Sequence, residues 1–223
     1  LRANTELNLE NILYPLKPID RLHHFFRRTE QFELDGNVIK YQQVEGSFTQ
    51  PNGEVNRKML GWAKGIAQQL TGDLLELYCG NGNFSLALTP CFNQVVATEI
   101  SRTSIRSAKH NIELNGVNNL QVLQMSAEDV SAALAQGAKL KHIDLAGLQL
   151  DTVLVDPPRA GLDADTERLV SRFNDIIYVS CNPETLAHNL KTLSKTHDVK
   201  QLAVFDQFPY THHIESGVWL KKR

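Results

Sequence analysis

The chain has 223 residues, 42% of them hydrophobic and 22% charged, so it can bury a core and is not a disordered polypeptide. Lysine and arginine number 23 and aspartate and glutamate 25, and this net charge of −2 does not by itself indicate a nucleic-acid partner. Three separated cysteines (Cys79, Cys91 and Cys181) without a CxxC pair exclude a disulfide scaffold or a four-ligand zinc site and favour a cytoplasmic protein. No apolar run has the length of a membrane span, and no signal-peptide pattern opens the chain.

Strand and helix patterns alternate along most of the chain. In chain order they predict a helix over 55–70, a strand over 74–78, a helix over 84–88, a strand over 95–98, a helix over 102–115, and strands over 120–125, 152–155, 176–179, 199–205 and 214–220. Ser101 is a predicted N-cap and Gly116 the stop of the same helix. A helix is expected after each strand except between the last two.

This alternation predicts an α/β fold with a doubly wound, mostly parallel seven-stranded sheet of Rossmann-like type, covered by helices on both faces. The last two strands predict a C-terminal antiparallel hairpin. Residues 137–147 are predicted to form one long loop. Residues 1–40 do not fit the alternation and begin with Leu1 rather than Met, so we interpret them as the remainder of a preceding region and 41–223 as the α/β domain.

A glycine turn follows the first predicted strand of the sheet. Gly80 and Gly82 stand where a ligand approaches the backbone in doubly wound folds, and Glu99 ends the next strand, where its carboxylate can accept both ribose hydroxyls. Only GxG is present, without the rest of the dinucleotide fingerprint. The pattern therefore suits an adenosine ligand without phosphates, such as S-adenosylmethionine. The alternative is a tight turn with a solvent-facing glutamate.

Asp156-Pro157-Pro158-Arg159 follows the fourth strand at the same edge of the sheet. The prolines fix an extended backbone that places Asp156 over the ligand crevice. Amino-group methyltransferases carry an aromatic residue after this Asp-Pro-Pro, and Arg159 in that place argues against amine methylation. A rigid strand-exit turn without a function remains the alternative.

Cys181 lies between the fifth strand and a helix that begins near Glu184. The N-terminal dipole of that helix favours a thiolate, although a lone cysteine is more often a buried, inert thiol. Its position at the same sheet edge as Glu99 and Asp156 favours a nucleophile. Cys79 and Cys91 have no such neighbours and are interpreted as packing or surface residues.

The segment from Asp206 to Glu215 joins the last two strands, and its return toward the ligand edge brings Glu215 near Cys181. The adjacent His212 and His213 suggest a metal site, but adjacent side chains of an extended chain point in opposite directions. We therefore expect no metal here.

Five motifs in order resemble the RNA uracil-5-methyltransferase family, most closely its tRNA (uracil-5-)-methyltransferase branch. They are Phe48-Thr49-Gln50-Pro51-Asn52, Leu77-Tyr78-Cys79-Gly80-Asn81-Gly82-Asn83-Phe84, Asp156-Pro157-Pro158-Arg159, Ser180-Cys181-Asn182-Pro183 and the segment from Asp206 to Glu215. Within the last of these, the stretch from Phe208 to Glu215 is similar to the tRNA enzymes rather than to their ribosomal relatives. Family members also carry a longer N-terminal region that helps to grip RNA.

The resemblance implies an S-adenosylmethionine-dependent methyltransferase domain over 41–223 that methylates carbon 5 of a uridine in RNA, with uridine-54 of the tRNA T-loop as the expected target. It implies that Cys181 is the nucleophile, that Glu215 is the general base, and that the cofactor is held by Gln50, Tyr78, Asn83, Glu99 and Asp156. Candidate RNA contacts are basic residues that are individually more typical of solvated surface charge, namely Arg27, Arg28, Arg159, Lys191, Lys195, Lys221, Lys222 and Arg223.

Two other functions remain open at this point. A ribosomal-RNA uracil-5-methyltransferase shares every chemical step with the tRNA enzyme. A non-catalytic RNA- or cofactor-binding module on the same fold would have no need of Cys181 together with Glu215, so the presence of both residues argues against it.

Overall fold

The computed structural model describes residues 27–44, 48–136, 139–140, 143–144, 147–211 and 213–223. In chain order its elements are β1 (Arg27–Leu34), β2 (Asn37–Val44), α2 (Gly53–Ala67), β3 (Asp73–Leu77), α3 (Asn83–Leu88), η2 (Thr89–Cys91), β4 (Val95–Glu99), α4 (Arg102–Asn115), β5 (Leu120–Gln124), α5 (Ala127–Gln136), β6 (Lys139–Leu140), β7 (Ile143–Asp144), β8 (Leu150–Val155), α6 (Ala164–Val170), β9 (Asp175–Ser180), α7 (Pro183–Leu193), β10 (His197–Phe205) and β11 (Glu215–Lys222). Within these residues no helix is long and apolar enough to cross a membrane.

A seven-stranded sheet forms the centre of the molecule, in the order β10-β11-β9-β8-β3-β4-β5. Strands β5, β4, β3, β8 and β9 are parallel, and β11 is antiparallel to both of its neighbours. The predicted mostly parallel sheet and C-terminal hairpin are therefore confirmed. The last strand lies inside the sheet, because β11 inserts between β9 and β10.

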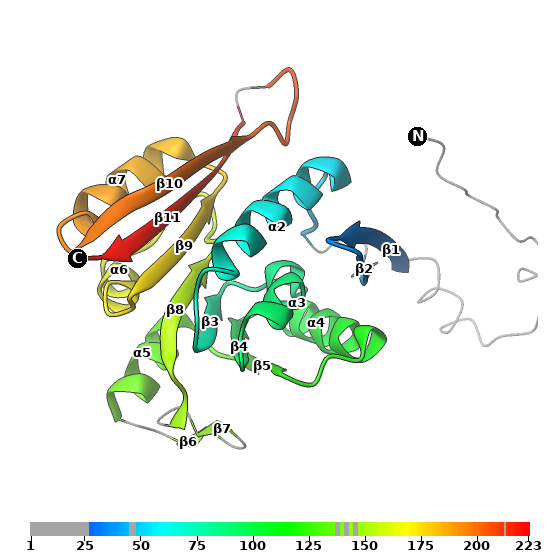
Figure 1. Cartoon of the computed structure of the whole chain (residues 1–223), viewed down its shortest axis with the longest axis horizontal. Coiled ribbons are helices and arrows are strands. Elements are labelled where there is room, and N and C mark those ends of the chain that lie inside the picture. Colours follow the sequence, from blue (N-terminus) through cyan, green and yellow to red (C-terminus); the bar gives the residue numbers. More distant parts are fainter. Residues whose placement is uncertain (1–26, 45–47, 137–138, 141–142, 145–146, 212) are drawn as a thin grey trace, which may run out of the picture.

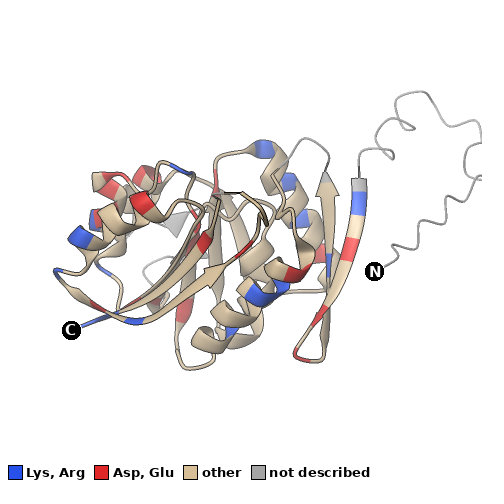
Figure 2. Cartoon of the chain, turned by 90° about the horizontal axis from the view of Figure 1, so that it is seen from above, with Lys and Arg blue, Asp and Glu red and all other residues tan. Residues whose placement is uncertain are grey.

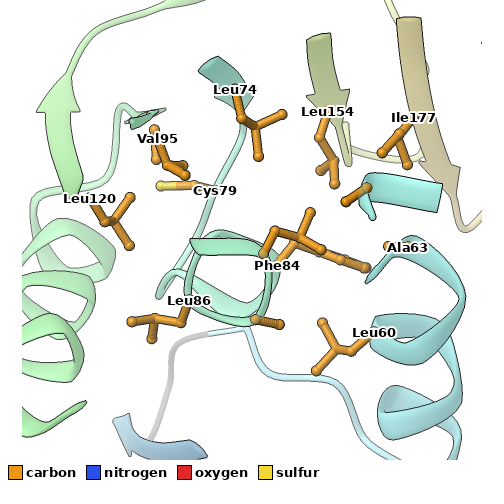
Figure 3. Close-up of a cluster of buried hydrophobic side chains, with 14 of the residues drawn as sticks. Leu60, Ala63, Leu74, Cys79, Phe84, Leu86, Val95, Leu120, Leu154 and Ile177 are labelled. Atoms are coloured by element: carbon orange, nitrogen blue, oxygen red, sulfur yellow. The ribbon is translucent and has the colours of Figure 1, made fainter. Parts of the chain in front are cut away.

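Helices cover both faces of the sheet, as the sequence predicts. One core layer joins the sheet to α2, α3 and α4, and the other joins it to α5, α6 and α7 (Figure 1). In the first layer Phe84 of α3 lies among Leu60 and Ala63 of α2 and Leu154 of β8 (Figure 3). Burial of a phenylalanine contributes about 2–3 kcal/mol, and here it anchors the short helix that follows the glycine turn.

Local capping signals set the ends of α4 as expected. The Ser101 side chain accepts a hydrogen bond from the Ser104 amide, and Gly116 ends the helix with φ 62° and ψ 28°. A left-handed conformation at this position is the usual reason for a glycine stop. The predicted loop over 137–147 is corrected in one respect, since its described parts include the short antiparallel pair β6 and β7.

A hairpin of β1 and β2 was missed by the sequence analysis. Its turn is Asp35-Gly36, with φ angles of 52° and 78°, and Leu34 pairs with Asn37 across it. An Asp-Gly pair between alternating apolar residues is a strong signal for such a two-residue turn. The domain boundary that we predict after residue 40 falls within β2, and the assignment of residues 1–40 to a preceding region stays a prediction. Residues 1–26 lie outside the described part.

The hairpin packs on the α2, α3 and α4 side of the sheet (Figure 1). The backbone of Lys40 exchanges two hydrogen bonds with the Asn115 side chain, and the Gln42 amide donates to Asn111 at 2.7 Å. The side chains of α4 thus satisfy one backbone edge of β2. Lys64, buried on α2, forms a 3.1 Å ion pair with Asp35 at the turn.

Candidate active site

The carboxyl ends of the parallel strands bring three predicted cofactor residues into one row. Leu77, the last residue of β3, pairs with the penultimate residue of β4 on one side and with the last residue of β8 on the other. Tyr78, Glu99 and Asp156 are the residues that directly follow these three positions, so all three lie at the same edge of the sheet. Residues far apart in the sequence come close to one another because parallel strands end at the same edge.

Cys181 and Glu215 come together through the antiparallel register of β9 and β11. The register of β11 with β9 ends at Ser216 and Ser180, and Glu215 and Cys181 are the next residues outward on the two segments. The charge of Glu215 raises the pKa of the Cys181 thiol, so the two side chains lie near each other. The structure therefore places the two predicted catalytic residues side by side, at the same edge as Asp156.

Carboxylates dominate the electrostatics of this corner. Burial raises the pKa of Glu215 to about 7, and burial followed by repulsion from Glu215 raises the pKa of Asp156 to about 8. Burial, then Glu215 and Asp156, also raise the pKa of the Cys181 thiol, against a smaller lowering by Arg159. The expectation of a thiol with a lowered pKa is therefore wrong, because burial and two nearby carboxylates outweigh the effect expected from the helix dipole.

The glycine turn is organised by Glu99. The Gly80 amide donates to one carboxylate oxygen at 3.1 Å, and the amides of Ile100 and Ser101 donate to the other at 2.8 Å each. Gly80 has φ 56°, and a Cβ built on it would meet no atom within 4 Å. The turn thus combines a fixed carboxylate with open space beside the backbone.

Tyr78 holds a strained backbone at the centre of the row. Its φ is 63°, in the left-handed region that costs a non-glycine residue about 1–2 kcal/mol. The residue is half-buried, and burial raises the pKa of its hydroxyl. Such strain gathers at functional sites, where the surrounding structure fixes a side chain for a task.

Asn83 is placed differently from the other candidates. Its side-chain amide exchanges two hydrogen bonds with Asn56 of α2, at 2.9 and 3.0 Å. The backbone carbonyl oxygen of Asn83 accepts a 2.8 Å hydrogen bond from the buried Tyr41 hydroxyl. These bonds fix the start of α3 against α2, and a direct cofactor contact by the Asn83 side chain stays a prediction.

Gln50 lies just before α2 and is half-buried. Its Oε1 accepts a 2.6 Å hydrogen bond from Nε2 of Gln207, a residue that is 2% exposed. Gln207 lies within the segment from Asp206 to Glu215, and the sequence by itself predicts no role for it. No local signal identifies it, since its burial depends on contacts with α2.

Arg159 contacts the segment that follows Cys181 and the segment that precedes Glu215. Its carbonyl oxygen accepts from Asn182 at 3.1 Å and from Thr185 at 3.2 Å, and its guanidinium lies 3.2 Å from Nδ1 of His213. The His213 ring in turn packs edge-on against Phe208. The metal site suggested by the two histidines falls partly on His212, which lies outside the described residues.

The predicted RNA contacts are exposed basic side chains, apart from Arg27, whose side chain is not described. In the view of Figure 2 lysine and arginine are interspersed with acidic residues rather than gathered on one face. Cys79 is buried in the core layer of α2–α4, and Cys91 is half-buried, as expected for residues outside the site.

Comparison of the sequence with known proteins identifies the family of the chain. A sequence model of the tRNA (uracil-5-)-methyltransferase family matches residues 22–223. The chain belongs to this family. A tRNA/tmRNA (uracil-C(5))-methyltransferase of Actinobacillus pleuropneumoniae serotype 7 is 55% identical over 197 residues, covering 87% of this chain and 54% of the relative. Its counterpart in Shewanella halifaxensis is 54% identical with the same coverage.

Solved structures agree with this family and with the fold. Pyrococcus abyssi tRNA (uracil-54, C5)-methyltransferase, crystallised with S-adenosyl-L-homocysteine, superposes with a TM-score of 0.66 at 28% identity, over 86% of this chain and 44% of that chain. Trm5b of the same organism, at 16% identity and a TM-score of 0.61 over 86% of this chain and 55% of that chain, supports the fold alone. The chain spans about half the length of the curated relatives that it matches.

Proposed function

We propose that this chain carries the catalytic centre of an S-adenosylmethionine-dependent methyltransferase that acts on carbon 5 of a uridine in tRNA, with uridine-54 as the target. The proximity of Cys181 and Glu215, just beyond the paired ends of β9 and β11, supports the proposal, because methylation at carbon 5 needs a nucleophile and a general base beside the cofactor. The names of the 54–55% identical relatives support tRNA, and the name of the Pyrococcus structure supports position 54.

The residues around the glycine turn fit the cofactor. Glu99 offers a carboxylate that is already held by three backbone amides, and Gly80 leaves open space where an adenosine would approach the chain. Tyr78 and Asp156 lie next in the row toward Cys181. When bound, S-adenosylmethionine supplies an electrophilic methyl group on its sulfonium, and Glu99 would accept its ribose hydroxyls.

Cys181 and Glu215 would act at different steps of the methylation of the uracil ring. Cys181 gives up its thiol proton to solvent, its sulfur bonds to carbon 6, and the electron pair of the ring double bond moves to carbon 5. Carbon 5 would then take the methyl group as the methyl–sulfonium bond breaks and S-adenosylhomocysteine leaves. Glu215 then accepts the proton of carbon 5, the double bond re-forms, and the bond from carbon 6 to sulfur breaks to release the Cys181 thiolate. The target base must leave its stack to reach this edge of the sheet, as for other base-modifying enzymes.

Methyl transfer from labelled S-adenosylmethionine tests the proposal on the full 223-residue chain, with a tRNA transcript and a ribosomal RNA fragment offered separately. Cys181→Ala should abolish transfer, whereas the same change at the half-buried Cys91 should preserve it. Methylation by Cys181→Ala would refute the proposal, and if the unaltered chain is inactive the same pair of variants is compared in a full-length relative. Methylation of ribosomal RNA alone would refute the tRNA assignment.

A tRNA carrying 5-fluorouridine gives an independent readout. Glu215 cannot remove fluorine as it removes a proton, so the reaction should stop after methylation with RNA still bonded to Cys181. The expected species is a band resistant to denaturation that is absent with Cys181→Ala. Calorimetry with S-adenosylhomocysteine tests the cofactor residues separately, and Glu99→Ala should weaken binding by about 10- to 100-fold, the loss of charge-assisted hydrogen bonds.

A further inference from the structure

Two segments from opposite ends of the domain meet at one part-buried hydrogen bond. Gln207 follows β10, Gln50 precedes α2, and 157 residues separate them. The bond joins Nε2 of Gln207 to Oε1 of Gln50 at 2.6 Å, and Gln207 is 2% exposed. Gln207 is shielded from water, so its amide nitrogen would have no water to replace Gln50 if this bond were lost.

The surroundings of Gln207 fix which end of its amide faces Gln50. The Nε2 atom lies 2.6 Å from Oε1 of Gln50 and 3.9 Å from Sδ of Met59 on α2, and both of these atoms are acceptors. An oxygen in the place of Nε2 would face two acceptors without a proton between them. With Gln50 in this orientation, the Nε2 donor of Gln207 faces Gln50 and Met59. The Oε1 atom of Gln207 is buried without a partner among the described residues.

The same hydrogen bond sets the orientation of the Gln50 amide. Since Oε1 of Gln50 is occupied as an acceptor, the end of Gln50 left for a ligand is its Nε2 donor. Within the described residues Nε2 of Gln50 has no hydrogen-bond partner. The Nε2 group of Gln50 is thereby available to donate to an acceptor oxygen of a ligand.

The position of Gln50 indicates which part of the cofactor it meets. Gln207 emerges from β10, at the opposite side of the sheet from β4, where Glu99 would hold the ribose. The end of S-adenosylmethionine remote from the adenosine is its amino-acid part, and the acceptor there is the carboxylate.

We infer that Gln207 is a positioning residue that locks the Gln50 amide with its donor toward the carboxylate of the amino-acid part of the cofactor. The inference rests on the proposed function for the identity of this ligand. Through the same bond the loop that leads to Glu215 is joined to the cofactor side of the site, although Gln207 itself touches no reacting atom.

Two ligands distinguish this role from general structural support. S-adenosylhomocysteine carries the amino-acid carboxylate, whereas 5′-methylthioadenosine has the same adenosine without the amino-acid part. Gln207→Leu fills a similar volume, frees the Gln50 amide and removes a buried oxygen that has no partner among the described residues, so the fold should keep its thermal midpoint. We expect the dissociation constant for S-adenosylhomocysteine to rise about 5- to 20-fold and that for methylthioadenosine to stay unchanged.

A double-mutant cycle tests whether Gln207 acts through Gln50. Gln50→Ala should weaken S-adenosylhomocysteine binding to a similar extent, and adding Gln207→Leu should cause no further loss. Gln201→Leu, the same substitution at an exposed position of β10, is the matched control and should change neither affinity. If Gln207→Leu lowers the thermal midpoint, Gln207→Met repeats the test with an unbranched side chain of similar length.

The outcomes separate the positioning role from the proposed function. Unchanged S-adenosylhomocysteine binding, an equal loss for both ligands in a folded variant, or additive losses in the cycle would each overturn the positioning role alone. Binding of neither ligand by the unaltered chain would overturn the cofactor assignment and this inference with it.

Discussion

The raised pKa of Glu215 predicts how the last chemical step depends on pH. With a pKa of about 7, Glu215 is about 10% deprotonated at pH 6, half deprotonated at pH 7 and about 90% deprotonated at pH 8. Only the deprotonated carboxylate can accept the proton of carbon 5. Resolution of the methylated covalent intermediate should therefore accelerate about tenfold between pH 6 and pH 8 and then level off.

A pH jump isolates this step from the titration of Cys181. The covalent intermediate is first accumulated near pH 6 with methyl-labelled cofactor and tRNA, where release is slow and the thiol has already reacted. The sample is then mixed into buffers of rising pH, and the band resistant to denaturation is followed as it disappears. Because the bond from carbon 6 to sulfur already exists, the pKa of the free thiol no longer affects the rate.

Glu215→Gln is the control, since the amide keeps the shape of the side chain but cannot accept the proton. Its intermediate should resolve about 10²- to 10⁴-fold more slowly and without the pH dependence. A wild-type rate that is flat from pH 6 to pH 8 would show that Glu215 is fully ionised or not the base. A midpoint near 8 would instead assign the proton transfer to Asp156.

Two further predictions concern stability. Glu76 is buried and accepts a hydrogen bond from Ser85, and burial is the main cause that raises its pKa to about 8. The folded state therefore holds this proton more tightly than the unfolded state. The free energy of unfolding should fall by up to about 4 kcal/mol as the pH rises from 5 to 9. In denaturant titrations, the free energy of unfolding of Glu76→Gln should no longer show this fall with pH. An unchanged pH dependence would contradict the raised pKa of Glu76. Gly217→Ala should lose about 1–3 kcal/mol in the same assay because its Cβ would lie 2.6 Å from Trp62 ring carbons, whereas Gly65→Ala, in open space on α2, should be neutral or stabilising. Equal effects of the two alanines would refute the steric reasoning.

Local signals in the sequence identified the elements on either side of the site. The apolar run of β3 followed by Gly80 and Gly82, and the Ser101 cap with its Gly116 stop, are each decided by neighbouring residues. The order of the motifs then gave the family. The Asp35-Gly36 turn is also a local signal, so the hairpin of β1 and β2 was missed although the sequence contained it.

Tertiary structure decided what these residues do to one another. Glu215 comes close to Cys181 because β11 inserts between β9 and β10, in a register set by a whole ladder of backbone hydrogen bonds rather than by the segment around Glu215. The raised pKa of Cys181 depends on burial and on carboxylates from two other strands, which outweigh the local helix dipole that the sequence suggested. The hydrogen bond from Gln207 to Gln50 exists only because α2 packs over the end of β10. Sequence patterns determine local conformation, whereas dielectric, proximity and register arise only when distant segments share one core.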